Sequence, residues 1–206
     1  NTGLVGKWNL NNPAWDPMPA SDYFDQTYDV MVWEGDYWPN ENGVYKGVDD
    51  RNYGSSKQSG IWGPAKVDDE YLTDRLTRHA CEFIRKQKDK PFFLMLSYNA
   101  PHSPLHGKRE YKEKLQHIES EALQLYASMV LAIDDGVGLV LDALNESQIT
   151  ENTMVLFISD NGPATTRFKG MPKEWPRGEL LGSTAGLRGH KGTYYEGGIR
   201  VPFIIQ

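Results

Sequence analysis

The chain alternates between segments with a helical spacing of apolar residues and short, continuous apolar runs. Apolar residues recur at three- and four-residue steps over residues 70–87 and 120–145, which predicts two helices that each bury one face. The run FFLMLSY at residues 92–98 is typical of a strand covered on both faces, and MVLFIS at residues 154–159 also has the composition of a buried strand. This alternation predicts an α/β fold. Two further strands are expected, over residues 4–10 and 201–205.

The first predicted helix has a start signal and carries the only cysteine of the chain. Asp68 or Asp69 can cap it, so we expect it to begin near Glu70. Cys81 is interpreted as a buried helix residue, because a reactive thiol needs an electropositive and accessible setting. A single cysteine also excludes a disulfide framework and a cysteine-based metal cage within this chain.

Residues 11–67 lack periodicity almost entirely. Such a stretch inside a compact domain is commonly a functional loop region, so we interpret it as an irregular, aromatic-rich insertion within one domain. Residues 28–33 and 44–48 are expected to be strands of a hairpin with its turn at Asn42-Gly43. The aromatic side chains could stack on sugar rings, although a local mini-core is the interpretation we favour. These include Trp15, Trp33, Trp38 and Trp62.

Length and charge narrow the function classes. A chain of 206 residues is near the size of one domain and can bury a sizeable core. A net charge of -6 argues against nucleic acid as a partner, because nucleic-acid binding usually needs a clustered basic face. No apolar run approaches the roughly 18 residues of a membrane span, and no signal peptide is visible. The sequence therefore excludes charge-driven partners and does not reveal a cellular location.

Polar side chains follow two of the predicted strands. The run MVLFIS stops at Asp160 and Asn161, and ligands in open α/β sheets bind at the carboxyl ends of strands. Their carboxylate and amide oxygens suit a hard divalent cation, although Asp-Asn-Gly-Pro is also good turn chemistry. His102, in NAPHSPLH, is held between two prolines at the same predicted edge. These three residues are the first site candidates.

Two lysines are further candidates. Glycines bracket Lys191 in LRGHKGTYYEGG, which suits close approach of the backbone to an oxyanion. Lys7 lies between Gly6 and Trp8, and Asn9 falls on the same side of an extended segment. A lone lysine next to tryptophan is also typical of a solvated side chain.

Four segments, taken together and in order, resemble the sulfatases of the alkaline phosphatase superfamily, of the arylsulfatase and N-acetylgalactosamine-6-sulfatase type. They are GKWNL at Lys7, NAPHSPL at His102, SDNGP at Asp160 and LRGHKGTYYEGGIRVPFI around Lys191. The resemblance implies a mixed, mostly parallel sheet with helices on both faces. Because the chain begins and stops within apolar segments, we expect residues 1–206 to be part of one catalytic domain, truncated at both ends.

The resemblance also implies a role for each candidate. Asp160 and Asn161 match half of a Ca²⁺ site, whose other ligands are acidic residues near the family's N-terminus. His102 matches the residue that protonates the leaving alcohol, and Lys191 and Lys7 match the cations that hold the sulfate oxygens. Cations around a spreading negative charge, and an acid for the leaving oxygen, are what sulfate ester cleavage requires. The expected substrate is a sulfated carbohydrate or an aryl sulfate, and the family resemblance implies a periplasmic, secreted or lysosome-like location.

Two departures from the family pattern leave alternatives open. The family nucleophile is a formylglycine made in a C-x-P-x-R segment, and this chain has none, so we expect the fragment alone to be inactive. Asn9 stands where the family usually has a histidine that takes a proton, and an amide cannot accept one at neutral pH. A phosphatase or phosphodiesterase of the same fold, or a protein that binds sulfated ligands without cleaving them, therefore remain alternatives. We also expect the fragment to self-associate through exposed sheet edges.

Overall fold

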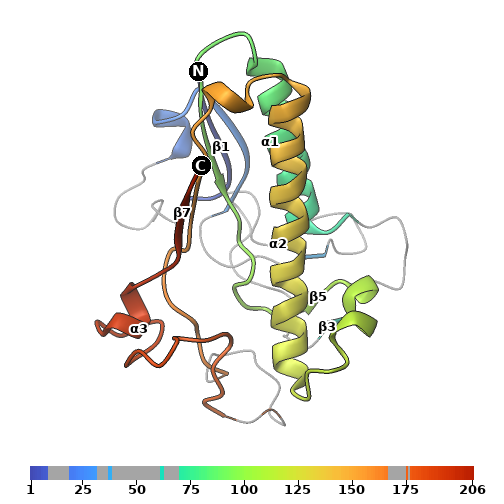
Figure 1. Cartoon of the computed structure of the whole chain (residues 1–206), viewed down its shortest axis with the longest axis vertical. Coiled ribbons are helices and arrows are strands. Elements are labelled where there is room, and N and C mark those ends of the chain that lie inside the picture. Colours follow the sequence, from blue (N-terminus) through green and yellow to red (C-terminus); the bar gives the residue numbers. More distant parts are fainter. Residues whose placement is uncertain (9–18, 32–36, 39–60, 63–69, 167–174, 176) are drawn as a thin grey trace.

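The computed structural model describes residues 1–8, 19–31, 37–38, 61–62, 70–166, 175 and 177–206. Its main sheet has three parallel strands in the order β2-β1-β4, and two small two-stranded sheets stand beside it (Figure 1). The strands of the main sheet are β1 (Thr2–Lys7), β2 (Gln26–Met31) and β4 (Phe93–Ser97). The parallel pair is β3 (Ile61–Trp62) with β5 (His106–Gly107), and the antiparallel pair is β6 (Leu156–Ile158) with β7 (Phe203–Ile205). The mixed, mostly parallel α/β architecture is thereby confirmed.

Two long helices cover one side of the main sheet in the part of the chain that the structure describes. They are α1 (Leu72–Gln87) and α2 (Glu121–Glu146), which lie against each other along their lengths (Figure 1). Leu94 of β4 packs against both of the clusters of buried residues that these helices form. Gly3 of β1 is needed here, because a Cβ at this position would lie 2.5 Å from the Phe83 ring of α1. Short helices complete the fold: α3 (Glu196–Ile199), η1 (Ala20–Asp22), η2 (Arg109–Tyr111), η3 (Glu113–Leu115) and η4 (Thr150–Asn152).

The helix boundaries follow the sequence pattern closely, with one correction. Ser120 caps α2, because its hydroxyl accepts a hydrogen bond from the Leu123 N–H, as is usual at an N-cap. The first helix begins at Leu72, and its N-cap residue is Tyr71, which makes no side-chain capping bond. The prediction that an aspartate caps α1 is therefore wrong, and both aspartates lie outside the described residues. Cys81 is buried, as expected, and its burial raises the pKa of the thiol.

Two strands are less covered than their composition predicts. On β4, Phe93 and Met95 are 59% and 38% exposed, because they point away from the side on which α1 and α2 lie. All three residues of β6 are exposed as well. The expectations that β4 is covered on both faces and that β6 is buried are thus wrong for this chain. A continuous apolar run shows that a strand can be buried on both faces, but it does not show whether another helix or strand packs on each face.

Only parts of the irregular region 11–67 are described. The expected strand at residues 28–33 overlaps β2, which pairs in parallel with β1, and the expected second strand at 44–48 lies outside the described residues. Trp38 is buried against the Tyr71 ring at a centroid distance of 4.8 Å, which fits a local mini-core. The side chains of the other three tryptophans of this region are not among those described. Within the described part of the chain, no helix has the length and apolar character needed to cross a membrane.

Candidate functional site

Lys7 and Asp160 are far apart in the chain and meet in the fold. Lys7 is the last residue of β1, and Asp160 follows β6 by two positions. The Lys7 ammonium group donates a hydrogen bond to Asp160 Oδ2 over 3.2 Å. The Lys7 side chain is 15% exposed, whereas that of Asp160 is 66% exposed. The structure thus brings a cation and an accessible carboxylate together at the ends of two strands.

Backbone hydrogen bonds join the loop after β6 to the segment that carries Lys191. The Lys191 N–H donates to the Pro163 carbonyl over 2.8 Å, and the Gly162 N–H donates to the Gly198 carbonyl over 2.9 Å. A Cβ on Gly162 would lie 2.0 Å from the carbonyl oxygen of Gly197, so only glycine fits. The glycines of this region therefore permit close approach of one backbone to another. The two segments form one unit, which we call the site clamp (residues 160–163 and 188–198).

His102 follows the strand next to the one that ends in Lys7. Its backbone is fixed from both sides, since its N–H donates to the Asn99 carbonyl and its carbonyl accepts from the Tyr37 hydroxyl. Its ring Nδ1 lies 2.8 Å from the Ser103 carbonyl oxygen. A carbonyl oxygen can only accept a hydrogen bond, so the Nδ1 that contacts it carries a hydrogen.

The structure gives fewer contacts for the other two candidates, Asn161 and Asn9. Asn161 is half-buried, and its backbone carbonyl accepts a hydrogen bond from the Ser159 hydroxyl over 2.9 Å. Asn9 lies outside the described residues, so its position relative to Lys7 stays a prediction. The structure therefore groups Lys7, Asp160 and the backbone of Lys191, with His102 in the loop that follows the neighbouring strand β4.

The oxygen donors of Asp160 and Asn161 are of the type that a hard cation binds, but they are fewer than such a cation needs. Asp160 offers a carboxylate and Asn161 an amide, which are oxygen ligands that Ca²⁺ takes, but Ca²⁺ needs six to eight. Among the described residues, no three His, Cys, Asp or Glu side chains gather closely enough to hold a metal ion. Lys7 already contacts Asp160 Oδ2, which leaves the other carboxylate oxygen for a further partner.

Asn99 is a polar residue of this region that the sequence argument passed over. It lies just after β4 and is 3% exposed, yet neither atom of its side-chain amide has a hydrogen-bond partner among the described residues. Buried amides are nearly always paired, so an orphan next to a candidate site is informative. The signal available in the sequence was an asparagine between an apolar run and the Ala-Pro pair.

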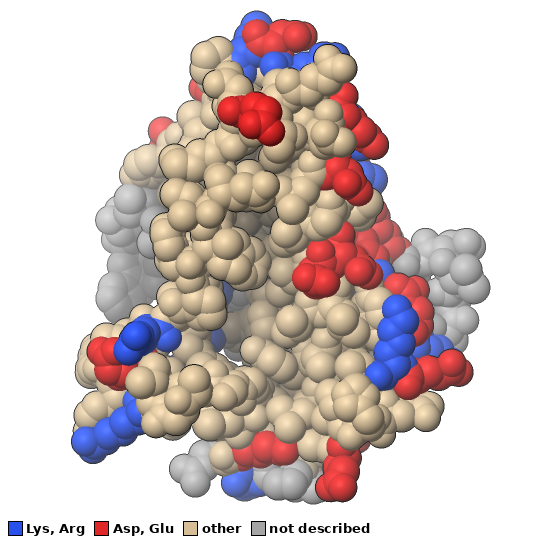
Figure 2. Space-filling model, viewed as in Figure 1, with Lys and Arg blue, Asp and Glu red and all other residues tan. Residues whose placement is uncertain are grey.

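Charge on the surface is not spread evenly. Figure 2 shows acidic side chains beside α2, while basic and acidic side chains are mixed near α3. The first three residues of α3 belong to the site clamp, and Arg200, which follows α3, pairs with Glu196 over 3.8 Å. The fold is thus an α/β protein with a lysine and an accessible carboxylate in contact after two of its strands, and the ends of strands are where open α/β sheets bind ligands.

Comparison with known proteins identifies the family. The Sulfatase family model matches residues 1–206. Arylsulfatase J of Mus musculus is 30% identical over 97% of this chain, and the uncharacterized sulfatase YdeN of Escherichia coli K12 is 30% identical over 99%. The crystal structure of Ps i-CgsB in complex with k-i-k-neocarrahexaose superposes with a TM-score of 0.72 at 28% identity, over 100% of this chain and 44% of that one. The chain belongs to the sulfatase family, and it spans 31% of arylsulfatase J and 36% of YdeN.

Proposed function

We propose that the protein to which this chain belongs hydrolyses sulfate esters, with a sulfated carbohydrate or an aryl sulfate as substrate. The observation that carries the proposal is the contact between Lys7 and Asp160 beside the site clamp, within a chain that belongs to the sulfatase family. The names of relatives support the substrate class. They include an N-acetylgalactosamine-6-O-sulfatase of Bacteroides thetaiotaomicron, 27% identical, and the structure with a bound neocarrahexaose.

In this proposal each side chain of the site has a role that follows from its charge. Lys7 and Lys191 hold the sulfate oxygens, whose negative charge spreads as the ester bond breaks, so two fixed cations favour the transition state. His102 gives a proton to the leaving alcohol from Nε2, while Nδ1 stays anchored on the Ser103 carbonyl. The anchored ring needs no reorientation during proton transfer, which is why the Ser103 contact supports the assignment.

Asp160 and Asn161 would hold a Ca²⁺ ion together with ligands from outside this chain. When bound, the ion supplies further positive charge for a sulfate oxygen. The described residues do not fit a formylglycine: Cys81 is buried in α1 and is followed by no C-x-P-x-R pattern. The nucleophile is therefore expected to lie outside this chain.

A second function, binding without turnover, is favoured by Asn9. An amide can hydrogen-bond a sulfated ligand but cannot take the proton that the family's histidine takes. Full-length protein that binds a sulfated glycan and releases no sulfate would select this function. A phosphatase or phosphodiesterase is the remaining alternative, and it would release the aryl alcohol faster from an aryl phosphate monoester or diester than from an aryl sulfate.

The experiment is hydrolysis of an aryl sulfate by the full-length protein, with Ca²⁺ and after its removal by a chelator. We expect activity that depends on Ca²⁺ and that falls roughly 100-fold or more in His102→Ala and Lys191→Ala. Lys86→Ala is the matched control, because Lys86 is exposed on the last turn of α1, and it should leave activity unchanged. Wild-type rates in both site variants would overturn the assignment of these residues.

We also propose that the isolated 206-residue chain associates with itself through exposed strands. The support is the exposure of apolar residues on β4, β6 and β7, of which Ile204 is 60% exposed. Figure 2 shows almost no charged side chains on the surface around β7. Surfaces of this kind favour association.

A further inference from the structure

The two strands β1 and β2 fall out of regular register just before Lys7. Val5 pairs with Tyr28, but Lys7 pairs with Met31, so one residue of β1 stands opposite two residues of β2. This is a β-bulge, and bulges are known to re-aim the side chains that follow them. The residue opposite the bulge is Gly6, directly before Lys7.

Both strands adopt unusual backbone conformations at the bulge. Gly6 has a φ of 95°, and a Cβ at this position would lie 2.2 Å from the Ser97 carbonyl oxygen of β4. Asp29, one of the two bulged residues, has a φ of 47°, in the left-handed region that few residues other than glycine adopt. Asparagine and aspartate tolerate this region better than other side chains, but a contact is still needed to hold it.

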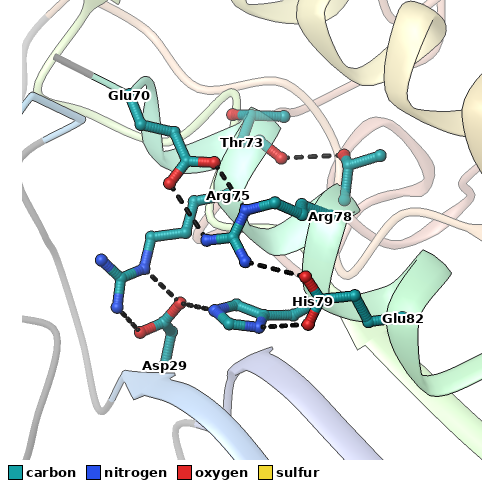
Figure 3. A network of polar contacts seen from close by, with 8 residues as sticks. Asp29, Glu70, Thr73, Arg75, Arg78, His79 and Glu82 are labelled. Carbon is teal, nitrogen blue, oxygen red and sulfur yellow. Dashed lines mark hydrogen bonds and ion pairs between the residues drawn. The ribbon is translucent and has the colours of Figure 1, made fainter. Parts of the chain in front are cut away.

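That contact is a pair of hydrogen bonds to α1 (Figure 3). Arg75 donates from Nε to Asp29 Oδ2 over 2.7 Å and from Nη2 to Oδ1 over 2.8 Å, a two-bond geometry that fixes the carboxylate in direction as well as in place. His79 Nε2 lies 3.2 Å from the same Oδ2, and the Asp29 side chain is only 9% exposed. The carboxylate is therefore fully engaged by one helix.

The neighbouring charges leave this pairing undisturbed. Arg78 binds Glu70 over 2.9 Å and Glu82 over 3.1 Å, which occupies the two nearest glutamates (Figure 3). His79 lies between the two groups, with Nε2 3.2 Å from Asp29 Oδ2 and Nδ1 3.8 Å from Glu82 Oε2 (Figure 3). The two hydrogen bonds from Arg75 fix the carboxylate at the bulge, while Arg78 binds the two glutamates at the outer face of α1.

We propose that Asp29 and Arg75 are positioning residues, which hold the bulge between β1 and β2 and thereby direct Lys7 toward Asp160. Side chains alternate between the two faces of a regular strand, so removing the irregularity at Gly6 turns the Lys7 side chain away from the β6 end. A role of this placement in catalysis rests on the proposed function, in which Lys7 holds a sulfate oxygen. The placement itself does not depend on it.

The test measures the Lys7–Asp160 contact directly in the 206-residue chain. A water-soluble carbodiimide activates the exposed Asp160 carboxylate. The Lys7 amine then attacks the activated carboxyl group, so that an amide bond forms and the carbodiimide leaves as a urea. We expect mass spectrometry to find this cross-link in the wild type and to find none in Asp160→Asn. In Asp29→Ala and in Arg75→Met the yield should fall roughly fivefold or more, because amide formation depends on proximity.

Two further variants separate positioning from general stability. Glu82→Gln alters the same network without touching Asp29, so it should lower the melting temperature at most and keep the full cross-link yield. Arg75→Lys keeps the charge but loses one of the two bonds, so it should restore part of the yield lost in Arg75→Met. If Asp29→Ala does not fold, Asp29→Asn replaces it, because asparagine accepts the same φ. Wild-type yields in the folded Asp29 and Arg75 variants would overturn the proposal.

The outcome is separable from that of the proposed function. If the cross-link depends on Asp29 while the full-length protein cleaves no sulfate ester, the positioning role stands and the sulfatase assignment fails. If the full-length protein is a sulfatase whose Asp29→Ala variant retains both cross-link and rate, the positioning role fails alone.

Discussion

His79 shows how a single buried ring can make stability depend on pH. Its Nε2 lies 3.2 Å from Asp29, whereas its Nδ1 has no hydrogen-bond partner among the described residues. Burial lowers the pKa of this histidine below its ordinary value, and it outweighs the opposing effect of the nearby Asp29 carboxylate. The ring is therefore neutral in the folded protein at neutral pH, with its hydrogen on the Nε2 that faces Asp29.

A neutral buried histidine predicts loss of stability on acidification. The unfolded chain binds a proton at the ordinary histidine pKa of 6.5, and the folded chain binds it only at lower pH. Stability from this residue is therefore complete above that value and is lost as the pH falls below it. Chemical denaturation between about pH 8 and about pH 5 should show a steeper loss for the wild type than for His79→Gln. Parallel curves for the two proteins would contradict the assignment of a neutral ring.

At the scale of elements, Lys108 connects three parts of the fold. Its ammonium group binds Asp74 of α1 over 2.8 Å and Glu110 of η2 over 2.9 Å, and its backbone N–H donates to Ser128 of α2. The ammonium group also lies 5.3 Å from the centre of the Tyr111 ring. Burial raises the pKa of the Asp74 carboxyl even beside this lysine, so the ion pair offsets a real desolvation cost.

Removal of this lysine should therefore leave the partly buried Asp74 carboxylate without its ion-pair partner. We expect Lys108→Met to lower the free energy of unfolding by about 1–3 kcal/mol, less than for a fully buried pair because the Asp74 side chain is 41% exposed. The double variant with Asp74→Asn should recover part of the loss, since no unpaired charge remains. Urea denaturation of the two single variants and the double variant measures the coupling, and strictly additive losses would argue against it.

Elements with local signals could be predicted from the sequence, and elements set by distant contacts could not. The helical spacing of apolar residues defines α2 within the chain itself, and α2 (Glu121–Glu146) lies within one residue of the predicted bounds 120–145. The bulge at Asp29 has no such signal, because its φ is held by Arg75 on another element. For the site, the sequence predicted Lys7 and Asp160 individually, and only the fold shows that they touch. Asn99 was missed because burial of a polar residue is a property of the packing.

At the scale of the whole molecule, apolar surface is concentrated on the strands. Phe203 and Ile205 of β7 are 59% and 58% exposed, and Leu156 and Ile158 of β6 are 51% and 60% exposed. The helices α1 and α2 lie on the other side of the main sheet from the exposed residues of β4. The net charge of -6 opposes association, but it is concentrated elsewhere, so Figure 2 shows little of it near β7.

This surface predicts association that depends on concentration. Analytical ultracentrifugation of the chain should show a mean mass above that of the monomer, which increases with protein concentration. Ile204→Lys should shift the population toward monomer, since it places a charge on an exposed strand. Leu139→Lys is the matched control, because Leu139 is 56% exposed but lies on α2, and it should change little. A wild-type monomer at every concentration would contradict the prediction.

The two ends of the segment between Thr166 and Glu179 are tied together. The Thr166 N–H donates to the Glu179 carbonyl and the Leu181 N–H donates to the Ala164 carbonyl, each over 2.8 Å, so a closed base stands beside the site clamp. Lengthening a segment anchored in this way costs only about 0.6 kcal/mol for each doubling. Changes of length between these residues therefore leave the hydrogen-bonded base, and the backbone pairing of the site clamp next to it, in place.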